Sequence, residues 1–162
     1  MSETTQHPVD VCVTGDEAMI RIQGRMTFVE AHPLRKFCLR MMEQGVMRYV
    51  VDVMACSSMD STFIGVLAMV SLKGKGRGVR VEICGADEQV SGQILGLGLK
   101  RIFLFHDRCD ASLRAPTTLV GEDDRAAVQG TMLEAHETLV EADAENRSKF
   151  KDVLTYLRES SA

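Results

Sequence analysis

Residues 49–65 read YVVDVMACSSMDSTFIG, and this stretch decides the fold. It opens on a short, mostly apolar run rich in β-branched residues, the kind found in strands that are buried on both faces of a parallel sheet. Small polar residues follow at 55–60, and apolar residues at helical spacing begin at Ile64. The pattern predicts a central strand over 49–53, then a loop, then a helix.

The residues that precede the central strand predict a β-hairpin and a helix. Two alternating apolar and polar runs, at 9–14 and 18–23, are separated by a turn sequence. Thr27 then begins a capping-box pattern, which predicts a helix over 28–44. Pro33 lies inside this range and lacks a backbone N–H, so it either kinks the helix or marks its first turn.

The residues that follow the central helix continue the alternation of strands and helices. The patterns predict a strand over 79–84, a helix over 86–99 and a short strand over 102–105. The predicted order is ββαβαβαβ, and crossovers between parallel strands are right-handed almost without exception. We therefore predict an α/β fold with a single mixed, mostly parallel sheet and helices mainly on one face.

The C-terminal part of the chain has a different composition. Residues 1–115 carry 14 Lys and Arg against 13 Asp and Glu, whereas residues 116–162 carry 5 against 10. A polar linker is predicted over 107–118, and two apolar stripes at helical spacing follow it. We expect a domain over 1–115 and an acidic extension of two amphipathic helices over 116–162, whose stripes are buried against the domain, each other or a partner.

The charge distribution argues against a direct nucleic-acid-binding role. The formal net charge is −4, and phosphate binding needs clustered positive charge. Arg35, Lys36 and Arg40 lie close together in the sequence, but Glu30 and Glu43 flank them. We interpret this segment as a solvated face of a helix.

Two features bound the cellular context. Residues 1–8 lack a basic segment followed by an apolar run, so we expect a cytoplasmic protein without a secretory signal. The apolar run at 63–72 is too short for the roughly 20 residues of a membrane-spanning helix, so we expect no membrane insertion.

The cysteines show no CxxC pair, and we interpret them as reduced thiols and expect no metal or cofactor. The five are Cys12, Cys38, Cys56, Cys84 and Cys109.

No catalytic pattern stands out. A nucleophile elbow of the form G-x-S-x-G is missing from the sequence. We interpret His32 and His106 as surface or packing residues and His136, on an apolar stripe, as a satisfied interface residue. We predict no catalytic residue and no enzymatic activity; an enzyme with Cys56 or Ser61 as nucleophile is the least favoured hypothesis.

The stretch YVVDVMACSSMDSTFIG resembles the signature of the STAS family, in which the central strand leads through a loop into a helix start of the D-S-S/T-G-L-G type. The resemblance covers about residues 9–105 and implies a bacterial anti-sigma-factor antagonist. By this resemblance Ser61 matches the serine that a partner kinase phosphorylates, and Thr62 is the alternative. Phe63 stands where the family usually has glycine.

The same residues have a purely structural interpretation. Asp60, Ser61 and Thr62 precede an apolar helical run, and such side chains satisfy the free backbone N–H groups of a helix start. A helix N-terminus also tolerates a phosphate, through its dipole and its unpaired amides. Ser61 is therefore either a phosphorylation site or a helix cap.

We predict a partner-switching regulator that binds an anti-sigma-factor serine kinase or a related switch protein, with phosphorylation of Ser61 ending that binding. Asp60, Ser61, Thr62 and Phe63 are the expected partner-binding residues. The alternative, which Phe63 favours, is a STAS module that is not phosphorylated and acts as a scaffold or small-ligand sensor in a signalling or transport assembly. The sequence leaves a homodimer open.

Asp52 is an unusual residue in the central strand, because a carboxylate is costly to bury unless it is hydrogen-bonded. We predict that it lies near the C-terminal end of the strand. There it would face the backbone amides of the loop before Ser61.

Overall fold

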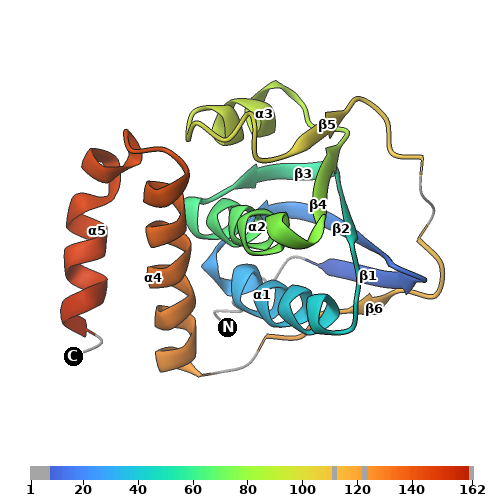
Figure 1. Ribbon diagram of the computed structural model, residues 1–162, viewed down its shortest axis with the longest axis horizontal. Coiled ribbons are helices and arrows are strands. Elements are labelled where there is room, and N and C mark those ends of the chain that lie inside the picture. The colour runs from blue at the N-terminus through green and yellow to red at the C-terminus, as the bar shows by residue number, and fades with distance from the viewer. Residues whose placement is uncertain (1–7, 111–112, 122–123, 161–162) are drawn as a thin grey trace, which may run out of the picture.

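The computed structural model describes residues 8–110, 113–121 and 124–160. Within these residues the chain forms one six-stranded sheet of order β5-β4-β3-β2-β1-β6, with the helices packed beside it (Figure 1). The strands are β1 (Val9–Thr14), β2 (Glu17–Met26), β3 (Arg48–Met59), β4 (Arg80–Cys84), β5 (Leu104–His106) and β6 (Thr117–Thr118). The α-helices are α1 (Phe28–Glu43), α2 (Ser61–Gly74), α3 (Glu88–Leu95), α4 (Arg125–Ala142) and α5 (Asn146–Ser160).

The predicted α/β fold and its order of elements are confirmed. Strands β2, β3, β4 and β5 run parallel, and β1 is antiparallel to both of its neighbours, β2 and β6. Helix α1 begins where the capping box predicts. The Thr27 side chain accepts from a backbone amide, and the Glu30 side chain accepts from the backbone N–H of Thr27. Pro33 lies inside α1 and not in its first turn.

Three predicted boundaries are wrong. Strand β3 runs on to Met59 through the expected loop at 55–60, because it keeps pairing with β2 beyond an irregularity in the register. Helix α3 ends at Leu95, before the two glycines that follow it. The expected linker over 107–118 contains β6, which extends the sheet beyond β1.

The main core lies on one face of the sheet. Inward-facing side chains of the strands meet apolar residues of α1, α2, α3 and α4 in one continuous cluster. Helix α2 is the most buried of these helices, since ten of its residues are buried. The largest fully buried side chains are Tyr49, Phe63, Ile20, Ile22, Met26, Leu34, Ile64, Leu67, Met69, Ile83, Ile94 and Leu99.

The opposite face of the sheet carries a much smaller apolar cluster of Met19, Val50 and Cys84. The segment between β5 and β6 runs from one edge of the sheet to the other (Figure 1). Cys109 in this segment forms a disulfide with Cys84 at the end of β4. The expectation that all five cysteines are reduced is therefore wrong, because the fold brings together two residues 25 positions apart.

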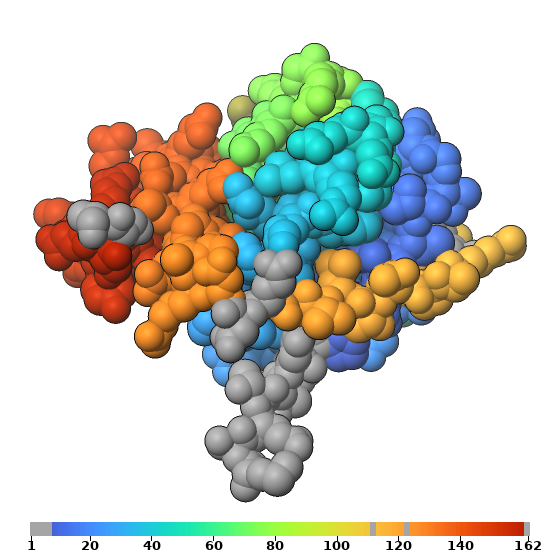
Figure 2. Space-filling view, turned by 90° about the horizontal axis from the view of Figure 1, so that it is seen from below, coloured from blue at the N-terminus to red at the C-terminus, as the bar shows by residue number. Residues whose placement is uncertain are grey.

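We call α4 and α5 together the helical hairpin. Helix α4 packs directly against α2 and α1, and α5 lies on the outer side of α4 (Figures 1 and 2). Both helices lie in the range of the expected extension. Of the residues in the expected stripes, His136, Leu139, Leu154 and Leu157 are buried and Val153 is exposed. Among the residues that the structure describes, we find no helix long and apolar enough to cross a membrane.

Candidate functional site

Asp60 lies at the junction of three elements, between the end of β3 and the starts of α2 and α1. Its Oδ1 accepts from the backbone N–H of Phe63 at 2.8 Å, and its Oδ2 accepts from the N–H of Phe28 at 3.0 Å. One carboxylate therefore caps two helices. Burial raises the pKa of Asp60, although the hydrogen bonds from the two amides oppose this shift.

Ser61 is the first residue of α2, and its half-buried hydroxyl contacts α4. Its Oγ lies 2.8 Å from Nε2 of His136, and Nδ1 of the same imidazole lies 2.7 Å from the carbonyl oxygen of Met132. A carbonyl only accepts, so Nδ1 carries a hydrogen, and in the neutral imidazole Nε2 is then the acceptor. The Ser61 hydroxyl donates to it. Phe150 of α5 packs edge-on against the imidazole, with ring centroids 4.9 Å apart.

The other two predicted site residues face inward. The side chain of Thr62 is 3% exposed, and that of Phe63 is 0% exposed. Phe63 belongs to the main core and contributes its backbone N–H to the Asp60 cap. The structure thus brings Asp60 and Ser61 together at the rim of the α2 and α4 contact and places Thr62 and Phe63 beneath it.

Helix α4 meets α2 at very short range. A Cβ atom added to Gly65 would lie 2.6 Å from the carbonyl oxygen of Ala135 and 2.7 Å from its Cβ. Such an approach needs glycine on one helix and a small residue on the other. Gly65 therefore sets the packing distance one turn beyond Ser61.

Charged and polar side chains complete the contact between the helical hairpin and the rest of the protein. The carboxylate of Glu134 on α4 pairs with Arg35 of α1 at 2.7 Å and with Lys73 of α2 at 3.1 Å. Next to this pair, Nδ1 of His32 lies 2.7 Å from the hydroxyl of Thr131, and both residues are buried.

The turn between the two helices is anchored separately. Asn146 is fully buried, and its Nδ2 donates to the carbonyl oxygens of Leu97 and Leu139. Lys149 donates to the carbonyl oxygen of Gly96 just after α3. The helical hairpin therefore contacts α1, α2 and the end of α3.

Asp52 is buried, but its partners differ from the predicted ones. It lies in the middle of β3, with Oδ2 3.2 Å from Nε of Arg21 and Oδ1 accepting from the backbone N–H of Met54 at 3.0 Å. The predicted support of the loop before Ser61 is wrong, because β3 continues past Asp52 and its side chain faces the sheet surface opposite the helices.

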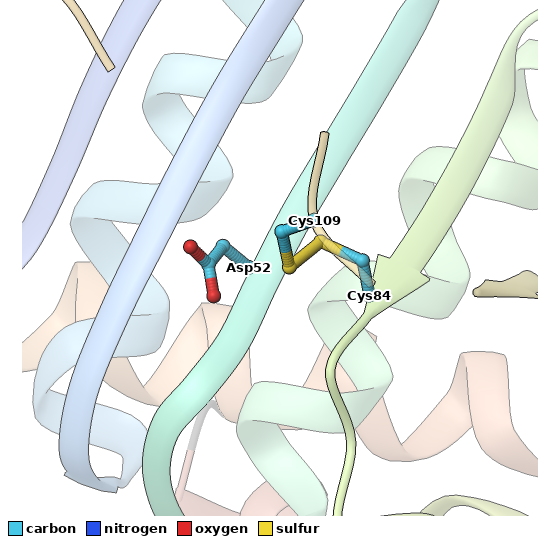
Figure 3. Close-up of side chains that lie close together, drawn as sticks. All are labelled: Asp52, Cys84 and Cys109. Carbon is cyan, nitrogen blue, oxygen red and sulfur yellow. A yellow bond between two sulfur atoms is a disulfide. The ribbon is translucent and has the colours of Figure 1, made fainter. Parts of the chain in front are cut away.

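Among the described residues, Asp52, Cys84 and Cys109 form a close group of metal-ligand types (Figure 3). Their ligand atoms lie within 4.8 Å of one another. In this structure both sulfurs are joined in the disulfide and Asp52 is paired with Arg21. The disulfide therefore links β4 to the segment after β5, and the ion pair of Asp52 links β3 to β2.

A row of charges on the same sheet face was not predicted. Glu82 accepts from Nη2 of Arg48 at 3.0 Å and lies 2.7 Å from Nε2 of His106, and Arg48 also binds Glu17. The hydrogen bond from Arg48 lowers the pKa of Glu82 more than burial raises it. These residues lie on four strands, β2 to β5, so the strand order was needed to join them.

Sequence reasoning also missed the partners of Ser61. It identified His136 as a satisfied interface residue, which is confirmed, but it did not connect this histidine to Ser61, 75 positions earlier. Gly65 and Ala135 gave no signal, because small residues within a helical pattern are common. Only the packing of α4 on α2 shows what these residues do.

Comparisons with known proteins agree on the fold. The family model described as "Mlab, STAS domain" matches residues 9–105, which is more than half of the chain. The helical hairpin lies beyond the matched residues. A search of curated proteins gave no match.

Solved structures with the same fold include anti-sigma-factor antagonists. The crystal structure of TM1081 from Thermotoga maritima, titled as a candidate antagonist of this type, has a TM-score of 0.55 at 17% identity, over 60% of this chain and 84% of that one. SpoIIAA, an anti-sigma-factor antagonist in its unphosphorylated form, has a TM-score of 0.51 at 15% identity, over 64% of this chain and 89% of that one. The solved structures agree in fold, and the match of the family model to residues 9–105 establishes that this chain belongs to the STAS domain family.

Proposed function

We propose that this protein is a cytoplasmic partner-switching regulator of the anti-sigma-factor-antagonist type. It binds an anti-sigma-factor serine kinase or a related switch protein, and phosphorylation of Ser61 ends that binding. The protein works by association and not by catalysis.

The observation that carries the proposal is the position of the Ser61 hydroxyl. It stands at the first residue of α2, directly after the capping Asp60, and it is only half-buried. Thr62, the alternative acceptor, is buried and would need a larger displacement to reach a kinase. Geometry therefore favours Ser61 over Thr62.

The electrostatics of a helix start support a switch that does not unfold the domain. A phosphate at this position is favoured by the dipole of α2. It also adds nearly two negative charges beside the carboxylate of Asp60. Repulsion and desolvation at a docked interface then weaken partner binding while the fold persists.

The structural neighbours support the same class of function. One is SpoIIAA, an anti-sigma-factor antagonist whose structure was solved in its unphosphorylated form. The proposal extends this behaviour to Ser61 of the present chain. The buried position of Phe63, where the family usually has glycine, places the aromatic ring in the core and away from a kinase.

The test begins with the protein isolated from its native cells. Mass spectrometry of the peptide that contains Ser61 is expected to find a phosphate on that residue. Isothermal titration of the co-purified partner is then expected to give at least tenfold weaker binding for Ser61→Asp, whereas Ser61→Ala binds like the wild type. A tenfold loss corresponds to about 1.4 kcal/mol.

The matched control is Ser57→Asp, which adds the same charge at an exposed position of β3. It is expected to bind like the wild type, and thermal melts establish that all three variants are folded. Equal affinities for the wild type, Ser61→Asp and Ser61→Ala would leave Ser61 with only its structural contact to His136 and end the proposal.

The second candidate is a STAS scaffold or small-ligand sensor that is not phosphorylated. The hydrogen bond between Ser61 and His136 favours it, because this bond already occupies the hydroxyl. An unmodified Ser61 in native cells, together with partner binding that is insensitive to Ser61→Asp, is the result expected for this candidate.

An enzyme has less support. The thiol of Cys56 is buried, and burial raises its pKa to about 11, so it is not a reactive thiolate near pH 7. Ser61 and His136 have the separation of a nucleophile and a base. However, the imidazole is only 3% exposed beneath Phe150 and is closed to a substrate in this conformation.

A further inference from the structure

We propose that α1 and α2 form a helix-binding surface around Ser61, which α4 occupies within the chain, and that a partner reaches Ser61 by inserting a helix of the same chemistry in place of α4. That helix carries a carboxylate for Arg35 and Lys73, a small residue for Gly65 and a hydrogen-bond acceptor for Ser61. The inference rests on the proposed function only in assigning partner control to Ser61.

Helix α4 is recognised at defined positions, as a bound helical ligand would be. Four residues within six positions of α4 make the specific contacts, and each meets a different group on α1 or α2. Thr131 binds His32, Glu134 binds Arg35 and Lys73, Ala135 lies on Gly65, and His136 binds Ser61. This is the pattern of a helix in a groove, recognised by residues on one face.

The residue of α4 that meets Gly65 must be small. Because a Cβ on Gly65 would overlap the backbone of Ala135, the two helix axes are as close as the backbone allows. A larger residue in place of Ala135 would push α4 outward. The surface is therefore selective for a helix with a small residue at this position.

Ion pairs between α4 and the other two helices also define the surface. Glu134 is held between cations from two different helices, and the side chains of Arg35, Glu134 and Lys73 are 26%, 29% and 49% exposed. These ion pairs lie at the rim of the contact, where charges set specificity and can exchange with water. A helix that carries a carboxylate one residue before the small residue fits this surface.

Docking of α4 on this surface also engages Ser61. While α4 is docked, the half-buried Ser61 hydroxyl is hydrogen-bonded to His136, whose imidazole packs against Phe150. The hydroxyl has a single hydrogen, so His136 and an acceptor on an external helix cannot both receive it. Binding of a partner at Ser61 must therefore compete with α4, and weaker docking of α4 raises the population of the open state.

The test uses the full chain with Glu134→Lys, which places a cation between Arg35 and Lys73 and weakens its own α4. The probe is a labelled synthetic peptide of residues 124–160 with the natural sequence. We expect this peptide to bind the Glu134→Lys chain at least tenfold more tightly than the wild type, whose surface is occupied. The matched control is Glu137→Lys, which makes the same charge change at an exposed position of α4 and is expected to behave like the wild type.

A second peptide tests specificity. The same sequence with Glu134→Lys is expected to bind the Glu134→Lys chain at least tenfold more weakly than the natural peptide. Equal binding of the natural peptide to the wild type, Glu134→Lys and Glu137→Lys chains overturns the proposal. So does equal binding of the two peptides to the Glu134→Lys chain.

Hydrogen exchange on the wild type keeps the proposal falsifiable if Glu134→Lys fails to fold. We expect the amides of α4 and α5 to exchange together and at least tenfold faster than those of α2, because the helical hairpin opens while the core stays closed. Equal protection of α2 and α4 would make the helical hairpin part of the core and overturn the proposal. None of these measurements involves a kinase, so an unphosphorylated Ser61 would end the proposed switch and leave this inference standing.

Discussion

Helix α2 has two flanks with different chemistry. The flank toward the sheet is apolar, with Phe63 and Ile64 in the main core. The flank toward α4 carries Ser61, Gly65 and Lys73, which make a hydrogen bond, a close backbone approach and an ion pair. The first flank is held by burial, which is not directional, and the second by contacts that specify position. One helix thus holds the fold and also recognises another helix.

The largest loss of stability is expected when a core side chain on the sheet flank of α2 is removed. Phe63→Ala leaves a cavity beneath α2, and we expect a loss of about 3 to 5 kcal/mol in the free energy of unfolding. Phe28→Ala, at a 42% exposed position at the start of α1, is the control and is expected to cost less than about 1 kcal/mol. Urea denaturation measures both. Similar losses in the two variants would contradict the assignment of Phe63 to the core.

The disulfide offers the next largest effect, because Cys109 ties the segment that leads to the helical hairpin onto the sheet. Reduction of Cys84–Cys109 releases a loop closed over a separation of 25 residues, and chain entropy alone predicts a loss of about 3 kcal/mol. Denaturation with and without dithiothreitol measures it. A variant with serine at both positions is the control and is expected to be insensitive to the reductant. A wild type that is equally insensitive would contradict the disulfide.

A smaller effect is expected at the contact between the two helices. Gly65→Ala overpacks against Ala135, and we expect a cost of about 1 to 3 kcal/mol, which exceeds the gain of about 1 kcal/mol from helix propensity. Gly92→Ala in α3 meets open space and is expected to be neutral or stabilising. Hydrogen exchange should show faster opening of α4 in Gly65→Ala alone. Unchanged exchange of α4 would mean that the two backbones do not approach as described.

The smallest effect is a difference in how Glu82 and Asp60 change the stability of the protein with pH. The pKa of Glu82 is below its ordinary value of 4.5, so its stabilisation is present above that pH and is lost as the pH falls through the lowered pKa. The pKa of Asp60 is raised above its ordinary value of 3.8, so ionisation costs stability as the pH rises through the interval above 3.8. The two groups therefore oppose each other in acid.

Melting temperatures from about pH 3 to pH 7 test this sign. Relative to Glu82→Gln, the wild type is expected to lose stability as the pH falls. Relative to Asp60→Asn, which keeps one oxygen to cap α2 but no second acceptor for the amide of Phe28, the wild type is expected to gain stability as the pH falls. Parallel curves for the wild type and both variants would show that neither carboxylate has the pKa shift described.

The sequence predicted the features that local rules determine. The capping box at Thr27, the β-branched central strand and the cap at Asp60 depend on residues close together in the chain, so the order of elements and the start of α2 could be predicted. The STAS resemblance over 9–105 coincides with the residues that the family model matches. The role of Ser61 in partner binding stays a prediction.

The features that the sequence did not predict depend on distant contacts. Strand β3 continues past residue 54 because β2 lies beside it, and the disulfide depends on how the segment after β5 crosses the sheet. Disulfides are uncommon in reducing compartments. The oxidation state of Cys84 and Cys109 in cells is therefore also a measure of where the protein works.

The contacts between α1 and α4 join residues far apart in the order of synthesis. His32 and Thr131 are 99 positions apart, as are Arg35 and Glu134. The receiving surface is completed by Lys73 of α2, which precedes Glu134 by 61 positions. At a translation rate of about 5 to 20 residues per second, α4 is therefore made roughly 3 to 12 s after that surface. During that interval the nascent chain has α1 and α2 but no α4 to cover Ser61. A partner already present at the ribosome therefore has a period in which it meets this surface without competition.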